Sequence, residues 1–218
     1  MNEKLLEINR LLKSIAHCHD YRYVDSEYEK IMQMIRDKKV EELETWQKNC
    51  RDTKVYETEQ KAQQLWDSIK SELTPEDIAE GYRIGCIELK GWLGGIIYYR
   101  MLIRMQTDES QLKRYPIESV KAIKSAPENE FQIYAETMIE AIKNDDPISY
   151  LFIGALGSYM KLEDFRKIIL IALNQRNRRT LDTAMAFAEQ SSMKEAIPLI
   201  ERLTTHPNDR LRNLAIKA

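Results

Sequence analysis

The sequence predicts an all-α protein, in which an N-terminal helical bundle or set of hairpins is followed by a short α-solenoid of about three helix pairs. Straight-chain residues that favour helices dominate the composition, and the 218 residues include only 7 Gly and 6 Pro. The sequence has no convincing alternating strand pattern and no Asn-Gly or Asp-Gly hairpin turn. In its C-terminal half, apolar positions recur with a period of about thirty residues.

The chain divides into three predicted regions. An N-terminal helical region covers 1–106, a junction covers 107–129, and helical repeats cover 130–218. The junction is rich in polar residues and holds two prolines, with one short helix expected around 117–124.

The first predicted helix runs over about 2–16. Its apolar residues recur at spacings of three and four, which places them on one face of a helix, and they are Leu5, Ile8, Leu12 and Ile15. A second helix is expected over about 27–49, with Tyr28, Ile35 and Trp46 among its buried positions. A third is expected over about 55–73, and the three could form an antiparallel bundle.

The stretch "LTPEDIAEGYRIG" gives the clearest local signal for a helix start. Thr74 can accept a hydrogen bond from a free amide of the first turn, and Pro75 suits the first helical position. One long helix is expected from here to about Met105. Its five glycines each cost about 1 kcal/mol relative to alanine in a helix interior. They indicate close helix packing, a kink at Gly94 and Gly95, or a hinge or ligand contact.

The C-terminal half contains three turn-like stretches, at 143–147, 174–177 and 205–208. A helix is expected before each turn, over about 130–143, 162–173 and 193–203, and another is expected after each. Sliding the sequence by thirty residues aligns Leu151 with Leu181 and Leu211. A single helix pair cannot bury its apolar face, whereas stacked pairs can, so the period predicts a solenoid.

The last unit, "KEAIPLIERLTTHPNDRLRNLAIKA", resembles a HEAT repeat, especially the short HEAT-like kind of about thirty residues. The resemblance rests on its first helix with Pro198, Leu199, Ile200 and Leu203, on the Pro207-Asn208 turn, and on Leu211, Arg212, Ala215 and Ala218. It covers about 25 residues. The two preceding units match poorly, since Asp182 and Phe152 stand where the last unit has Arg212. The resemblance implies an α-solenoid, and a fold of this kind does not fix an activity.

The charge balance argues against general binding to nucleic acid. The chain has 33 basic and 35 acidic residues, a net charge of −2, and so creates no long-range field that would hold a polyanion. Cys18, Cys50 and Cys86 are widely spaced and odd in number, which predicts free thiols in a reducing compartment. Neither a signal peptide nor a membrane span is recognised, so we expect a soluble, cytoplasmic protein without membrane partners.

Motifs that carry chemistry are missing from the sequence. It contains no G-x-S-x-G, no H-E-x-x-H and no Cys–His–Asn signature. His17, Cys18 and His19 suggest metal ligands, yet no further ligand follows at a recognisable spacing. We therefore predict no catalytic residue, no cofactor and no metal site.

The candidate partner-binding residues are five arginines, since guanidinium groups match carboxylate and phosphate geometry. Three lie in the basic turn "NQRNRR" and two in the last helix, and they are Arg176, Arg178, Arg179, Arg210 and Arg212. The alternative for the turn is a simple exposed connection.

These observations favour a non-enzymatic protein–protein interaction module, such as an adaptor, an assembly factor or an immunity protein, whose partner is another protein. The alternative is a nucleic-acid-binding protein or DNA-repair-type enzyme on a HEAT-like scaffold, which would need a positively charged groove. A third hypothesis, homo-oligomerisation through the N-terminal helices, is compatible with the first.

Overall fold

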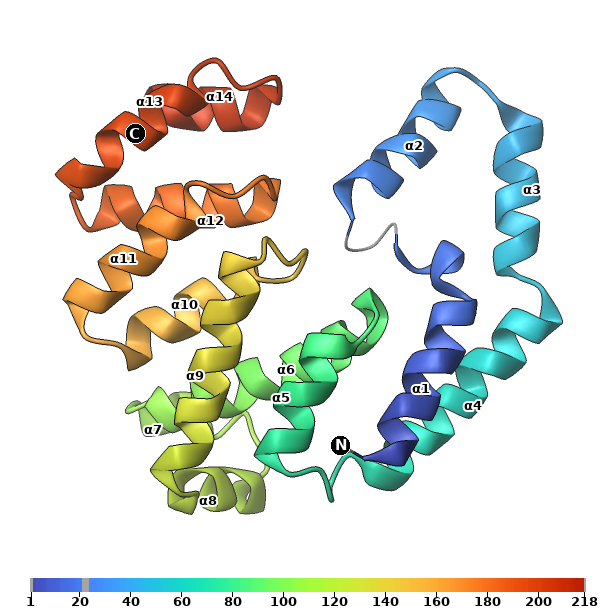
Figure 1. Ribbon diagram of the computed structural model, residues 1–218, viewed down its shortest axis with the longest axis horizontal. Coiled ribbons are helices and arrows are strands. Elements are labelled where there is room, and N and C mark those ends of the chain that lie inside the picture. Colours follow the sequence, from blue (N-terminus) through green and yellow to red (C-terminus); the bar gives the residue numbers. More distant parts are fainter. Residues whose placement is uncertain (1, 21–23, 218) are drawn as a thin grey trace. The chain divides into compact units, whose positions relative to one another are not determined.

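The computed structural model describes residues 2–20 and 24–217 (Figure 1). Every regular element in these ranges is helical, which confirms the all-α prediction. The chain forms two compact units, Met1–Gly95 and Ile96–Ala218. Within the described residues, none of the helices combines the length and the apolar character that crossing a bilayer requires.

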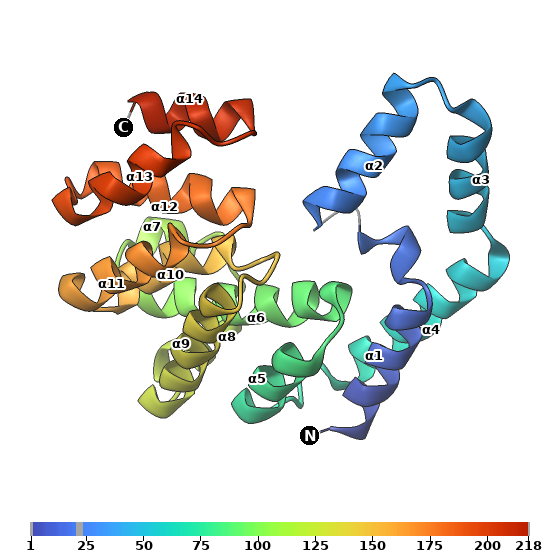
Figure 2. The same ribbon diagram turned by 45° about the horizontal axis from the view of Figure 1, so that its top comes forward.

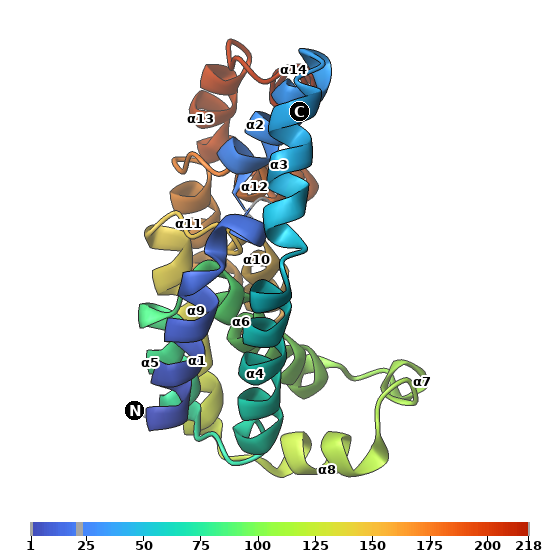
Figure 3. The ribbon, with the colours of Figure 1, turned by 90° about the vertical axis from the view of Figure 1, so that its right-hand side faces the viewer.

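The first unit is built around two helices that pack along each other. Its elements are α1 (Glu3–Ser14), the 3₁₀ turn η1 (Ala16–Cys18), α2 (Asp25–Arg36), α3 (Val40–Cys50), α4 (Thr53–Ile69), α5 (Pro75–Ile84) and the start of α6 (Ile87–Met105). Figure 3 shows α1 and α4 side by side. The four predicted core residues of α1 are all buried, as are Ala62, Trp66 and Ile69 of α4. The pattern of threes and fours therefore identified the buried face of α1.

The single helix predicted over 27–49 is wrong. Two helices, α2 and α3, occupy this stretch, and between them Lys38 adopts a φ of 53°, in the left-handed region. Tyr28 and Ile35, predicted to be buried, are 43% and 49% exposed, and α3 has no buried residue. Their helical spacing gives α2 an apolar face, but spacing alone does not determine whether another element covers that face.

The predicted start of α5 is confirmed at the atomic level. Thr74 is the N-cap residue, its Oγ1 accepts from the backbone N–H of Asp77 at 3.1 Å, and Pro75 begins the helix. The helix then ends at Ile84, far short of the predicted end near Met105.

The break between α5 and α6 is held by a buried asparagine from α1. Asn9 Oδ1 accepts from Cys86 N at 2.7 Å, and its Nδ2 donates to the Ile84 carbonyl at 3.4 Å. These bonds pair two backbone groups that the break would leave unsatisfied. A Cβ on Gly85 would lie 2.7 Å from the Gly81 carbonyl oxygen, so glycine fits here. The break thus lies at Gly85, and the predicted kink site at 94–95 is inside the continuous helix α6.

The second unit contains three successive helix pairs. Its elements after α6 are α7 (Glu109–Leu112), α8 (Ile117–Ser125), α9 (Glu128–Lys143), α10 (Tyr150–Tyr159), α11 (Leu162–Ala172), α12 (Arg178–Gln190), η3 (Lys194–Ala196), α13 (Ile197–Leu203) and α14 (Asp209–Lys217). The pairs are α9 with α10, α11 with α12, and α13 with α14. Contacts of α9 with α11, of α10 with α12 and of α12 with α14 join successive pairs (Figure 2).

Buried residues of successive pairs are equivalent at a spacing of 31 residues. Four sets of three show this, namely Tyr134, Phe165 and Ala196; Met138, Ile169 and Ile200; Ala141, Ala172 and Leu203; and Ile153, Ala184 and Ala215. The same spacing thus relates buried positions in all three helix pairs.

The predicted spacing of thirty residues is one residue shorter than the spacing in the structure, so the predicted alignment shifts by one position with each helix pair. Leu151 is only half-buried, whereas its expected counterparts Leu181 and Leu211 are buried. The spacing of 31 instead aligns Leu211 with Ser149 and Thr180, all of them fully buried. Pro147 and Pro207 are not equivalent at this spacing, because Pro147 follows Asp146 whereas Pro207 precedes Asn208, the residue that corresponds to Asp146.

The C-terminal part of α6 belongs to the second unit. Arg100 Nε donates to Glu130 Oε1 at 2.5 Å, and Arg104 Nη2 lies 3.1 Å from Glu128 Oε2. The Arg104 guanidinium carbon also lies 4.8 Å from the centre of the Phe131 ring. These contacts attach α6 to α9, so the unit begins at Ile96, and the whole predicted junction 107–129 lies inside it.

Candidate functional site

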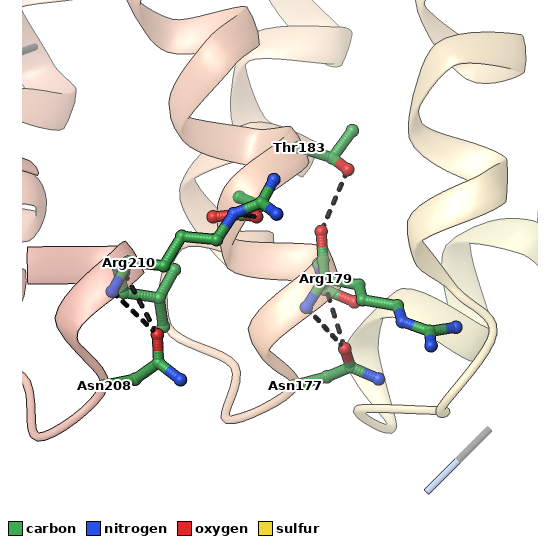
Figure 4. Close-up of polar contacts among 8 residues, drawn as sticks. Asn177, Arg179, Thr183, Asn208 and Arg210 are labelled. Atoms are coloured by element: carbon green, nitrogen blue, oxygen red, sulfur yellow. Dashed lines mark hydrogen bonds and ion pairs between the residues drawn. The ribbon is translucent and has the colours of Figure 1, made fainter. Parts of the chain in front are cut away.

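Three residues spaced by 31 positions precede the second helices of the pairs: Asp146, in the turn before α10, and Asn177 and Asn208, directly before α12 and α14. Each Oδ1 accepts from the backbone N–H two residues on, at 3.2, 2.9 and 3.1 Å respectively. The two asparagines also accept from the next N–H (Figure 4). Such caps satisfy the free amides at a helix start. We call residues 145–148, 176–179 and 207–210 the capping edge.

Side chains of the capping edge also join the first pair to the second. Asp145, with a φ of 54°, accepts from the backbone N–H groups of Arg176 and Asn177, both at 3.0 Å. Asn177 Nδ2 donates to the Pro147 carbonyl at 2.9 Å. The basic turn that contains Arg176 is therefore fixed by hydrogen bonds and is not a loose connection.

Arg179, Arg210 and Arg212 contact groups of the chain itself. Arg179 Nη1 donates to the Tyr150 hydroxyl at 3.3 Å, and its guanidinium carbon lies 5.4 Å from the centre of that ring. Arg210 Nε lies 2.8 Å from Asp182 Oδ2 (Figure 4). Arg212 pairs with Asp209 and donates from Nη1 to the His206 carbonyl at 2.9 Å. These contacts join α12 to α10 and α14 to α12, and they fix the start of α14.

Of the other two arginines, Arg176 lies in the turn before α12 and Arg178 is the first residue of that helix. Arg176 is exposed, and no side-chain hydrogen bond or ion pair is found for it within the described part of the chain. Arg178 is half-buried. The Arg210 side chain is 72% exposed despite its ion pair with Asp182. Arg176 and Arg210 therefore present guanidinium groups to solvent, and such groups can pair with carboxylates of a partner.

A second cluster of reactive side chains lies in the first unit. Cys18 is buried at the end of η1, and its pKa is raised to about 12, first by burial and then by a side-chain hydrogen bond with Cys50. The neighbouring His19 has a buried side chain whose Nε2 lies 3.5 Å from Glu59 Oε1. Residue spacing drew attention to 17–19 only. It could not reveal Cys50 or Glu59, because these residues come from α3 and α4.

No group of three or more His, Cys, Asp and Glu side chains in the described ranges is arranged to hold a metal ion. His17 contributes its backbone to this region, since its carbonyl accepts from Trp46 Nε1 at 3.4 Å. Cys18 and Cys50 contribute two thiols to this cluster.

The two asparagine caps give a matched test of the capping edge. Asn177→Ala removes the cap of α12 and also leaves the Pro147 carbonyl without its donor, so we expect a loss of about 2–3 kcal/mol in the free energy of unfolding. Asn208→Ala removes only a cap and should cost about 1 kcal/mol. Urea unfolding followed by circular dichroism measures both. Equal losses would show that the bond to Pro147 contributes nothing to stability.

Comparison of the chain with protein-family models, with curated proteins and with solved structures gives no match.

Proposed function

We propose that the chain is a non-enzymatic protein–protein interaction module of the cytoplasm, acting as an adaptor, an assembly factor or an immunity-type protein. Its second unit serves as a short HEAT-like α-solenoid that binds another protein along the capping edge. The observation that carries the proposal is the spacing of 31 residues between Asp146, Asn177 and Asn208, which precede three helices, α10, α12 and α14, with α12 in contact with the other two. Stacked repeats of this kind form extended surfaces suited to binding.

The state of the arginines supports a protein partner over a polyanion. Arg179, Arg210 and Arg212 already contact Tyr150, Asp182 and Asp209 of the chain itself. Binding to nucleic acid draws on several cations that release counterions together, whereas a few exposed guanidinium groups suffice to pair with carboxylates. We therefore expect an acidic surface on the partner.

Charge reversal at the turn before α12 tests the proposal. In affinity purification from the source cell, Arg176→Glu/Arg178→Glu should lose a protein that the unaltered chain retains, with affinity reduced by about tenfold or more, because reversed charges oppose an acidic partner. The matched control is Lys113→Glu/Lys121→Glu, which reverses two exposed charges near α7 and α8.

Circular dichroism and the unfolding midpoint show whether each variant remains folded. Retention of the same partner by both double variants would remove the turn from the binding surface. Recovery of a nuclease-sensitive nucleic acid in place of a protein would contradict the proposal as a whole.

A further inference from the structure

Two cysteines from elements distant in sequence lie close together in the first unit. Cys18 is the last residue of η1 and Cys50 is the last residue of α3, and these two elements are in contact. The bond from Trp46 Nε1 to the His17 carbonyl ties α3 to η1 next to the thiols. Cys18 follows His17 directly, and Cys50 lies one helical turn after Trp46 on the same face of α3, so both thiols lie at this contact.

The two thiols differ in their access to solvent. Cys18 is 5% exposed, whereas Cys50 is half-buried and can be reached from solvent. Burial, followed by the neighbouring Cys50 side chain, raises the pKa of Cys18, so Cys18 is kept as a protonated thiol. A small oxidant in solution therefore reaches Cys50 first, and Cys18 is placed to react second.

We propose that Cys18 and Cys50 form a reversible intramolecular disulfide when the chain meets a small-molecule disulfide such as oxidised glutathione. The Cys50 thiolate attacks one sulfur of the oxidant, whose S–S bond breaks and releases a thiolate that takes up a proton. Cys18 then gives up its proton and attacks the Cys50 sulfur of the mixed disulfide, releasing the second glutathione thiol. Two chain thiols are oxidised, one small disulfide is reduced to two thiols, and both protons end on those thiols.

The disulfide would restrain α3, a helix that packs weakly against the rest of the first unit. No side chain of α3 is buried, and its contacts include η1 and α2. Elements with few buried contacts open locally at low cost in free energy. A covalent bond from Cys50 to η1 restricts that opening, so the redox state of the pair would control how firmly the α2–α3 hairpin is held.

The test uses the full chain in glutathione redox buffers. After the remaining thiols are alkylated, mass spectrometry of peptides measures the fraction of chain with a Cys18–Cys50 link and hence the equilibrium constant of its formation. In the folded chain this constant should exceed the value in concentrated urea by about tenfold or more, because folding holds the thiols together. Equal constants, or glutathione adducts without the link, would overturn the proposal.

Two variants and one further measurement sharpen the result. Cys50→Ser, at a half-exposed position, should abolish the link, and Cys86→Ser should leave it unchanged. Amide hydrogen exchange of residues 40–50 should slow by about threefold or more on oxidation, since local opening of α3 is restricted. If the amide exchange rates of residues 40–50 are the same in the linked chain as in the reduced chain, the proposed control of the α2–α3 hairpin by the disulfide is contradicted.

Discussion

Replacing Arg100 by methionine is expected to lower the free energy of unfolding of the second unit by about 3–5 kcal/mol. Two guanidinium nitrogens of Arg100 lie 2.5 Å from Glu130 Oε1, and the Glu130 side chain is only 9% exposed. Without the arginine, a carboxylate stays buried with no cation beside it. The cost of that unpaired charge exceeds the net stabilisation provided by the ion pair itself. Urea unfolding, with hydrogen exchange in α9, measures the loss.

A double variant separates the cost of the unpaired charge from that of lost packing. Arg100→Met/Glu130→Met removes both charges and keeps apolar volume, so it should recover most of the loss caused by Arg100→Met alone. Arg10→Met is the control, since Arg10 pairs with Glu7 at 77% exposure and should cost less than about 1 kcal/mol. A double variant no more stable than Arg100→Met would show that Arg100 acts through packing and not through charge.

Sequence patterns identified the elements whose causes are local. The buried face of α1 follows from its spacing of apolar residues, and the start of α5 follows from Thr74 and Pro75. The break at Gly85 could not be predicted in this way. It depends on Asn9, which belongs to another helix and pairs with both sides of the break. Local signals determine where helices start, whereas tertiary partners decided where this one ends.

The features of the candidate site likewise divide into those visible in the sequence and those that depend on tertiary contacts. An Asp or Asn before a helical stretch is visible in the sequence, and Asn177 and Asn208 both stand in such a position. The partners of the arginines are not visible, because Tyr150 and Asp182 come from the neighbouring helix pairs. The same holds for the proximity of Cys18 and Cys50. Residue type identifies side chains that can pair with charged groups, and only the packing of the helix pairs shows which of them are already engaged within the chain.

The first two helix pairs pack closely at Gly157 of α10. A Cβ placed there would lie 2.8 Å from Phe165 Cζ and within 3.2 Å of two further atoms of that ring. The Phe165 ring cannot turn aside freely, because it is buried and packs edge-on against Phe187, with the ring centres 5.4 Å apart. Well-packed interiors of this kind resist added volume.

Gly157→Val is therefore expected to lower the free energy of unfolding by about 3 kcal/mol, because the added carbons must displace two aromatic rings. Thermal and urea unfolding measure the change. Gly95→Ala is the matched control, since a Cβ at Gly95 meets no atom within 4 Å and a helix interior gains up to about 1 kcal/mol from this substitution. In the double variant Gly157→Val/Phe165→Leu, the smaller leucine makes room beside α10, so part of the stability lost in Gly157→Val should be recovered. If Gly157→Val instead unfolds at the same urea concentration as the unaltered chain, α10 and α11 pack less tightly than the contact between Gly157 and Phe165 indicates.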